Sequence, residues 1–173
     1  MLEKMDDFFN RRLEGYEEHQ LNVIEGAREF YPYTASLLPK NRGARVLDLE
    51  CGTGLELDYY FALNPSAQVV GVDLAGDMLA TLRKKSQWKT IATIQGSYFD
   101  IPFGKNQYDA VVSVESLHHF TKAEKNSYVL QSTAGFVIGR KLYPNRLLRR
   151  YSRRGGVFQT GTCPIKGGAG NNR

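Results

Sequence analysis

The sequence predicts an α/β fold in which a doubly wound, mostly parallel sheet carries helices on both faces. Two features between residues 45 and 114 favour this class. Short apolar runs alternate with helical segments of about ten residues, a rhythm typical of βαβ units. The apolar runs are nearly continuous, as expected for strands that are buried on both faces. Such crossovers are almost always right-handed, so the strands should form one open sheet.

The predicted elements follow one another along the chain. A helical segment opens the sequence, from about residue 6 to residue 38, and Pro32 is expected to interrupt it. Four strands are then predicted, at residues 45–49, 68–73, 90–95 and 108–114. Helices are predicted between the first three of these strands, at residues 55–63 and 77–85.

Composition divides the chain into three predicted domains: a helical cap over residues 1–42, a core over residues 43–125 and a basic tail over residues 126–173. All 18 acidic residues precede the tail, which holds nine of the 23 basic residues and eight of the 17 glycines. A short strand fits residues 136–138, but the tail shows no clear helix–strand pair. We therefore expect a sheet that is incomplete at its C-terminal end and exposes a strand edge there.

Several classes of protein are disfavoured by what the sequence contains. Its two cysteines, Cys51 and Cys163, give neither a disulfide framework nor metal-ligand spacing, so no metal site is predicted. The N-terminal residues are charged and do not resemble a signal peptide. No apolar run approaches the roughly 18 residues of a membrane span. We expect a cytoplasmic chain with no membrane partner.

A glycine-containing turn is the strongest chemical signal. Residues 46–54 read VLDLECGTG, a strand that runs into a turn and then into a helix. Ligands of open α/β sheets bind at the carboxyl ends of the strands. Glycines let the backbone approach a ligand closely, and the N-terminus of the following helix presents free N–H groups.

An acid at the end of the second strand strengthens that signal. Asp73 follows Gly54 by 19 residues, and an acid at this position can accept hydrogen bonds from both hydroxyls of a ribose. The alternative is that Asp73 caps the helix that follows, a position for which Asp77 also competes.

Four segments, in order and spacing, resemble the class I S-adenosylmethionine (SAM)-dependent methyltransferases, which have a Rossmann-like fold. The segments are VLDLECGTG, VVGVDLAGDML, IQGSYFDIPF and YDAVVSVESLHHF. The resemblance extends from about residue 6 to residue 125. It implies that SAM is the cofactor, and that a methyl group is transferred to an unidentified, small-molecule acceptor.

The resemblance also implies roles for individual residues. Asp48, Gly52 and Gly54 would shape the site for the methionine portion of SAM, and Asp73 would hold the ribose. The adenine would be lined and edged by Leu74, Met78, Ser97, Tyr98 and Phe99. Glu115 would border the reacting methyl group.

Two histidines and one tyrosine, His118, His119 and Tyr16, have two interpretations each. His118 and His119 follow the fourth strand and could act as the general base; alternatively, one faces solvent and the other forms a hydrogen bond within the loop. On the first helix, Tyr16 and His19 could cover the cofactor pocket as a lid. Simple packing against the core is the alternative for Tyr16.

The sequence departs from the family at two places. Glu50 occupies a position where the family has glycine, beside the amino-acid end of the cofactor. Its bulk, its charge or strain at φ > 0 would cost about 1–3 kcal/mol and weaken SAM binding about 5- to 150-fold. The second departure is the tail, whose abrupt start is typical of a truncation or a reading-frame shift after about residue 125.

Other functions remain open at this stage. The basic tail could bind RNA, or tether an enzyme that modifies RNA, in a salt-dependent way. The chain could also be an inactive SAM-binding remnant. A dinucleotide-binding dehydrogenase is disfavoured, because Leu57 stands where the third glycine of G-x-G-x-x-G would fall.

Overall fold

The computed structural model describes residues 8, 11–85, 91–104, 107–114, 135–140, 147–151 and 158–162. It confirms the predicted strands and helices of the core, each within about two residues of its predicted bounds. In chain order these elements are β1 Arg45–Leu49, α4 Leu55–Leu63, β2 Gln68–Asp73, α5 Gly76–Lys84, β3 Ile91–Gln95 and β4 Ala110–Val114.

The N-terminal segment forms two helices, α2 Tyr16–Val23 and α3 Ala27–Leu37. The expected interruption at Pro32 is wrong, because Pro32 lies inside α3 and the break falls at Gly26. Gly26 adopts φ 68° and starts α3 from the left-handed region, which glycine enters without steric cost. The buried residues of α3 keep a helical spacing across Pro32, at Ala27, Phe30, Tyr31, Thr34 and Ala35. Burial of this face outweighs the one hydrogen bond that proline removes.

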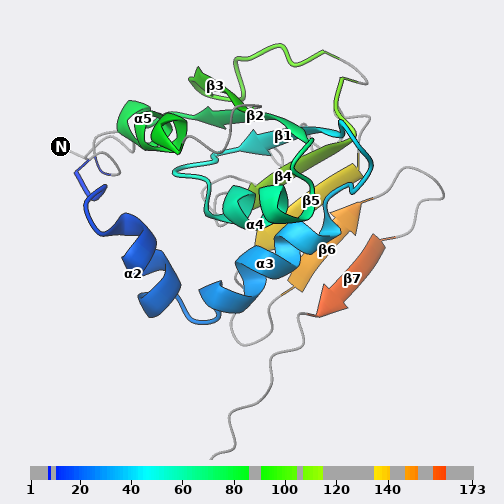
Figure 1. The fold of residues 1–173 in the computed structure, drawn as a ribbon, viewed down its shortest axis with the longest axis horizontal. Coiled ribbons are helices and arrows are strands. Elements are labelled where there is room, and N and C mark those ends of the chain that lie inside the picture. Colours follow the sequence, from blue (N-terminus) through cyan, green and yellow to red (C-terminus); the bar gives the residue numbers. More distant parts are fainter. Residues whose placement is uncertain are drawn as a thin grey trace, which may run out of the picture.

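Seven strands of the described residues form one sheet, in the order β3-β2-β1-β4-β5-β6-β7 (Figure 1). β1 is central and pairs in parallel with β2 and β4. β5 Gly135–Arg140 continues the parallel part, whereas β6 Leu147–Tyr151 and β7 Phe158–Thr162 are antiparallel. The short strand predicted at residues 136–138 therefore lies within β5. The sheet does not end at β4, contrary to the expectation of an incomplete sheet.

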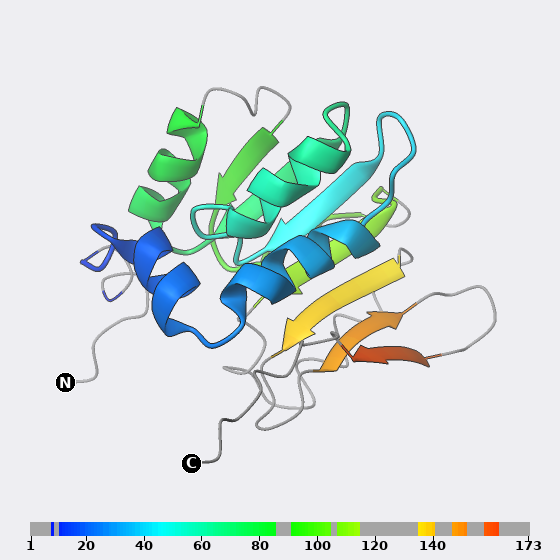
Figure 2. The ribbon, with the colours of Figure 1, turned by 60° about the horizontal axis from the view of Figure 1, so that its bottom comes forward.

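The two faces of the sheet have separate hydrophobic clusters. Val46, Val69 and Val112 pack with residues of α3, α4 and α5 on one face. Their neighbours along the strands, such as Leu47 and Val111, pack with Tyr98 on the other. This alternation follows from the two-residue period of a strand. The described helices lie on the first face (Figures 1 and 2). The predicted helical layer is therefore confirmed for this face, and a layer on the other face stays a prediction.

Helix α3 belongs to the same hydrophobic cluster as the strands and α4, and the division into a cap, a core and a tail stays a prediction.

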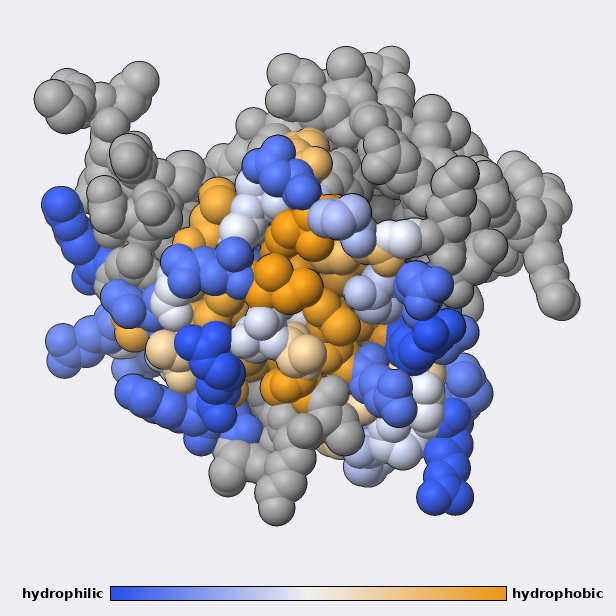
Figure 3. Space-filling model, turned by 90° about the horizontal axis from the view of Figure 1, so that it is seen from above, coloured by the Kyte–Doolittle hydropathy of each residue, from blue (hydrophilic) through white to orange (hydrophobic). Residues whose placement is uncertain are grey.

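No helix within the described ranges is long and apolar enough to cross a membrane. Within the same ranges, no group of three or more His, Cys, Asp or Glu side chains could hold a metal ion. Seen from above, apolar side chains gather at the centre of one face, between polar ones (Figure 3).

Candidate cofactor site

The turn between β1 and α4 has an unusual backbone. Three of its residues adopt positive φ: Glu50 at 59°, Gly52 at 51° and Gly54 at 76°. Glu50 is the one non-glycine residue with positive φ in the described part of the chain. A non-glycine residue with positive φ costs about 1–3 kcal/mol. The sequence predicted strain if Glu50 has positive φ, and it does. The family's glycine at this position would avoid that cost.

Asp73, at the end of β2, ties this turn to the next one. Its Oδ2 accepts a hydrogen bond of 2.8 Å from the Gly52 N–H, and its Oδ1 accepts one of 2.8 Å from the Ala75 N–H. No side chain caps α5, whose N-cap is Ala75. A carboxylate has about four lone-pair sites, so Asp73 retains acceptor capacity for other donors. Burial raises the pKa of Asp73, and the backbone hydrogen bonds oppose that rise.

A close contact at Gly71 fixes the distance between the two strands below these turns. A Cβ at Gly71 would lie 2.8 Å from the Cys51 Sγ, a separation too short for van der Waals contact. The Cys51 N–H also donates to the Val72 carbonyl over 3.1 Å. Gly71 is thus required for close packing of the first turn on β2.

Beneath the turn, Asp48 on β1 is fully buried. Neither of its oxygens receives a hydrogen bond from a donor group in the described part of the chain. Burial, followed by the neighbouring Glu56 and Asp73 carboxyls, raises the pKa of Asp48 well above its usual range. A buried polar group without a partner is rare in native proteins, so Asp48 marks a place where a ligand or solvent completes the site.

Among the neighbouring acids, Glu56 in the first turn of α4 has the largest effect on the pKa of Asp48. Glu56 was not identified as a site residue from the sequence. Its side chain is 3% exposed. Burial raises the pKa of Glu56 to about 7, although the Lys85 charge opposes the rise. The available signal was weak: a lone glutamate among apolar residues in LELDYYFAL.

The residues predicted to line the adenine differ in exposure. Leu74 and Phe99 are among the exposed large apolar side chains, at 43% and 40%, and each follows one of the neighbouring strands β2 and β3. Tyr98 is buried and stacks on Phe99 with ring centroids 4.6 Å apart. The half-buried Ser97 accepts a hydrogen bond from the Phe99 N–H over 3.3 Å. Met78 is 1% exposed, so its contact with a cofactor stays a prediction.

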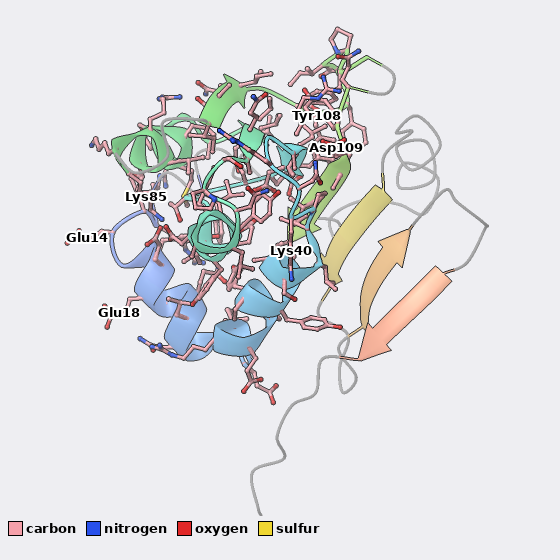
Figure 4. The ribbon with its side chains drawn as sticks, turned by 45° about the vertical axis from the view of Figure 1, so that its right-hand side comes forward. Glu14, Glu18, Lys40, Lys85, Tyr108 and Asp109 are labelled. Atoms are coloured by element: carbon pink, nitrogen blue, oxygen red, sulfur yellow. The ribbon has the colours of Figure 1, made fainter. Side chains whose placement is uncertain are left out.

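Helix α2 approaches the first turn from the side. The Tyr16 hydroxyl lies 3.9 Å from the position of a Cβ on Gly52, whereas His19 is exposed. Lys85, just after α5, forms ion pairs of 2.6 Å with Glu17 on α2 and 2.9 Å with Asp58 on α4. Figure 4 shows Lys85 between α5 and α2. The structure brings Tyr16 to the site; its role as a lid stays a prediction.

Three predicted site residues, Glu115, His118 and His119, lie outside the described residues. Of the remaining residues, Gly52 and Asp73 are joined by a hydrogen bond at the carboxyl ends of β1 and β2, which makes this edge of the doubly wound α/β sheet the candidate site. Its acid at the end of β2 and its apolar neighbours suit a nucleoside.

Comparison with known proteins identifies the family. Residues 46–134 match the methyltransferase-domain family, and the chain therefore belongs to it. The resemblance to class I SAM-dependent methyltransferases is thereby confirmed.

Two curated relatives and one solved structure illustrate the likeness. An uncharacterized methyltransferase of Synechocystis sp. is 32% identical over 61% of this chain and 48% of its own length. Fatty-acid O-methyltransferase of Mycolicibacterium smegmatis is 32% identical over 46% of this chain and 29% of its own. The SAM-dependent methyltransferase structure from Mesorhizobium loti has a TM-score of 0.54 at 24% identity, over 64% of this chain and 52% of that one, which shows the shared fold. The chain spans less than half the length of these two curated relatives.

Proposed function

We propose that this chain binds SAM at the carboxyl ends of β1 and β2 and transfers its methyl group to a small-molecule acceptor. The observation that carries the proposal is the fully buried Asp48, whose oxygens lack donors beneath a glycine turn. SAM brings a positively charged sulfonium and ammonium group, and a positive charge close to Asp48 would favour its ionised form, which burial disfavours.

The other residues of the site fit the remaining parts of SAM. Asp73 has acceptor capacity for ribose hydroxyls beyond its two backbone hydrogen bonds. Leu74 and Phe99 offer exposed apolar surface for a flat base. Gly52 and Gly54 add no side chains of their own to the turn, while Ser97 and Tyr98 would edge the adenine.

When bound, SAM supplies an electrophilic methyl group, so the protein's task is to align the acceptor and exclude water. His118 or His119 would take the acceptor's proton, and Glu115 would border the methyl group. One relative is named for a fatty-acid acceptor, which supports a small molecule as the acceptor class here.

Thermal unfolding with and without millimolar SAM tests the cofactor proposal. A ligand at about 100 times its Kd stabilises the folded state by about 2.7 kcal/mol, which raises the melting temperature by about 5–10 °C for a chain of this size. Asp73→Asn should lose most of this rise, because a carboxylate oxygen that accepts ribose hydroxyls is replaced by an amide.

The matched control is Asp77→Asn, the exposed acid four residues further on, which should keep the rise. A cooperative transition that SAM leaves unchanged in the wild-type chain would contradict the proposal. An equal rise in both variants would remove Asp73 from the site.

A further inference from the structure

Helix α2 buries little of its own surface. None of its residues is buried, and its Leu21 is only partly buried where it packs against the hydrophobic core. Glycines stand at both ends: Gly15, directly before α2, adopts φ 71°, and Gly26, shortly after it, adopts φ 68°. Glycine changes backbone conformation at little steric cost, so these residues do not anchor the helix. Polar contacts therefore have a large share in fixing where α2 lies.

Lys85, the residue just after α5, joins α2 to the rest of the protein. Its Nζ lies 2.6 Å from Glu17 Oε1 on α2 and 2.9 Å from Asp58 Oδ2 on α4. The Lys85 side chain is 18% exposed, against 37% for Glu17 and 33% for Asp58. Charges that form a network of this kind contribute more than an isolated surface pair. One half-buried ammonium thus links the end of α5 to α2 and α4 (Figure 4).

Tyr16, next to Glu17 in the first turn of α2, reaches the β1–α4 turn. Its hydroxyl lies 3.9 Å from the position of a Cβ on Gly52. The Gly52 N–H in turn donates to Asp73 Oδ2 over 2.8 Å, so Tyr16 stands where the turns after β1 and β2 meet. Residues of one helical turn are ordered together, and the ion pair that fixes Glu17 therefore fixes Tyr16 as well.

We propose that Lys85 is a positioning residue for the cofactor: its ion pair with Glu17 holds α2 in place, so that Tyr16 stays beside Gly52. The inference rests on the proposed function, in which the methionine portion of SAM lies at this turn. Lys85 acts through Tyr16 and does not itself touch the cofactor. With the ion pair intact, Tyr16 is already in place in the free chain, and SAM binds without first having to order α2.

Hydrogen exchange of the ligand-free chain tests whether Lys85 holds α2. Lys85→Met and Glu17→Gln each remove one partner of the ion pair, so the amides of α2 should exchange about threefold to tenfold faster than in wild type, and those of β1 should not change. Lys84→Met and Glu18→Gln alter the exposed neighbours of these two residues and should behave as wild type. Equal exchange of α2 in wild type, Lys85→Met and Glu17→Gln would overturn the inference, whether or not SAM binds.

Isothermal titration with SAM tests the effect on the cofactor. The Kd for SAM should rise about threefold to tenfold in Lys85→Met and in Glu17→Gln, and Lys85→Arg, which keeps the charge, should restore most of the affinity. Salt at about 0.3 M screens the ion pair more than salt at about 0.02 M, so the gap in affinity between wild type and Lys85→Met should narrow. The charge of SAM adds the same salt effect to every chain. A residue that only stabilised the fold would lower the melting temperature and leave no such gap.

A double-mutant cycle decides whether Lys85 acts through Tyr16. Tyr16→Ala should weaken SAM binding, and Lys85→Met should weaken it little further in that background. Fully additive losses, or unchanged SAM affinity in both Lys85→Met and Glu17→Gln, would overturn the inference and leave the proposed function intact. Absence of SAM binding by the wild-type chain and by every variant would overturn the proposed function, and this inference with it.

Discussion

The turn after β1 and the turn after β2 are joined by a hydrogen bond, yet they differ in how well their groups are satisfied. In the first, Glu50 is held at φ 59° and Asp48 is buried without donors. In the second, Asp73 accepts two backbone N–H bonds and no residue has positive φ. Backbone strain and unmet polar groups concentrate at functional sites. We infer that the second turn holds the first turn in place, and that a ligand satisfies the polar groups left without partners near the first turn.

The largest expected effect concerns pH and Glu56, the buried acid of α4 next to the first turn. Burial raises the pKa of Glu56 from 4.5 to about 7, so the folded chain holds a proton that the unfolded chain has lost. The stability this provides is fully present below about pH 4.5 and is lost as pH rises through about 7, by about 3 kcal/mol. Burial also raises the pKa of Asp48, which acts in the same direction.

Urea unfolding of the ligand-free chain at about pH 5 and about pH 8.5 measures this loss. Glu56→Gln should be markedly less sensitive to pH than wild type, whereas Glu29→Gln, which removes an exposed first-turn acid of α3, should not differ from wild type. If Glu56→Gln loses as much stability as wild type between the two pH values, Glu56 is not the group that makes the stability depend on pH.

A smaller effect is expected where the first turn packs on β2. Gly71→Ala places a Cβ 2.8 Å from the Cys51 Sγ, and overpacking of this kind costs about 2 kcal/mol. Cys51→Ala removes the sulfur, so the double variant should recover most of that loss. Denaturant unfolding of both single variants and the double variant forms a double-mutant cycle. Additive losses would show that the contact does not limit the approach of the strands.

The smallest of the three effects tests the strain at Glu50. Glu50→Gly should stabilise the free chain by about 1 kcal/mol, because glycine adopts φ 59° without a steric penalty. Glu50→Ala keeps the strain but removes the charge and bulk, and it should give no such gain. Titration with SAM then separates the causes of weak binding. If both variants bind SAM more tightly than wild type, the Glu50 side chain weakens binding. If Glu50→Gly alone binds more tightly, the strained backbone weakens binding. Equal affinities in all three chains would exclude Glu50 as a cause.

The core of the fold was predictable because its signals are local and strong. β1 and β2 are short apolar runs, each followed by a glycine-containing turn, and their bounds match the prediction. Pro32 was misjudged because a local rule was applied to a helix whose buried face extends across the proline. β6 was not anticipated, since Arg149 and Arg150 are not typical of a strand signal.

The candidate site was only partly predictable for a different reason. Asp73 and the glycines belong to a motif, so their placement follows from sequence spacing. Glu56 looks like an ordinary acid in the first turn of a helix, where the helix dipole favours it. Its burial depends on β1 lying beneath α4, which no local pattern reveals. From the sequence, strain at Glu50 could be predicted only for a positive φ, and the structure gives φ 59° at this residue.

The sheet order also carries a consequence for how the chain folds. Gly43 and Ser66, which are joined by a hydrogen bond beside the β1–β2 pair, are 23 residues apart, whereas Arg45 and Asp109, joined beside the β1–β4 pair, are 64 apart. Closing the shorter loop costs less chain entropy. We expect β1, α4 and β2 to assemble first, with the strand-end turns already side by side. The later strands would then dock onto a nucleus that contains half of the ligand site.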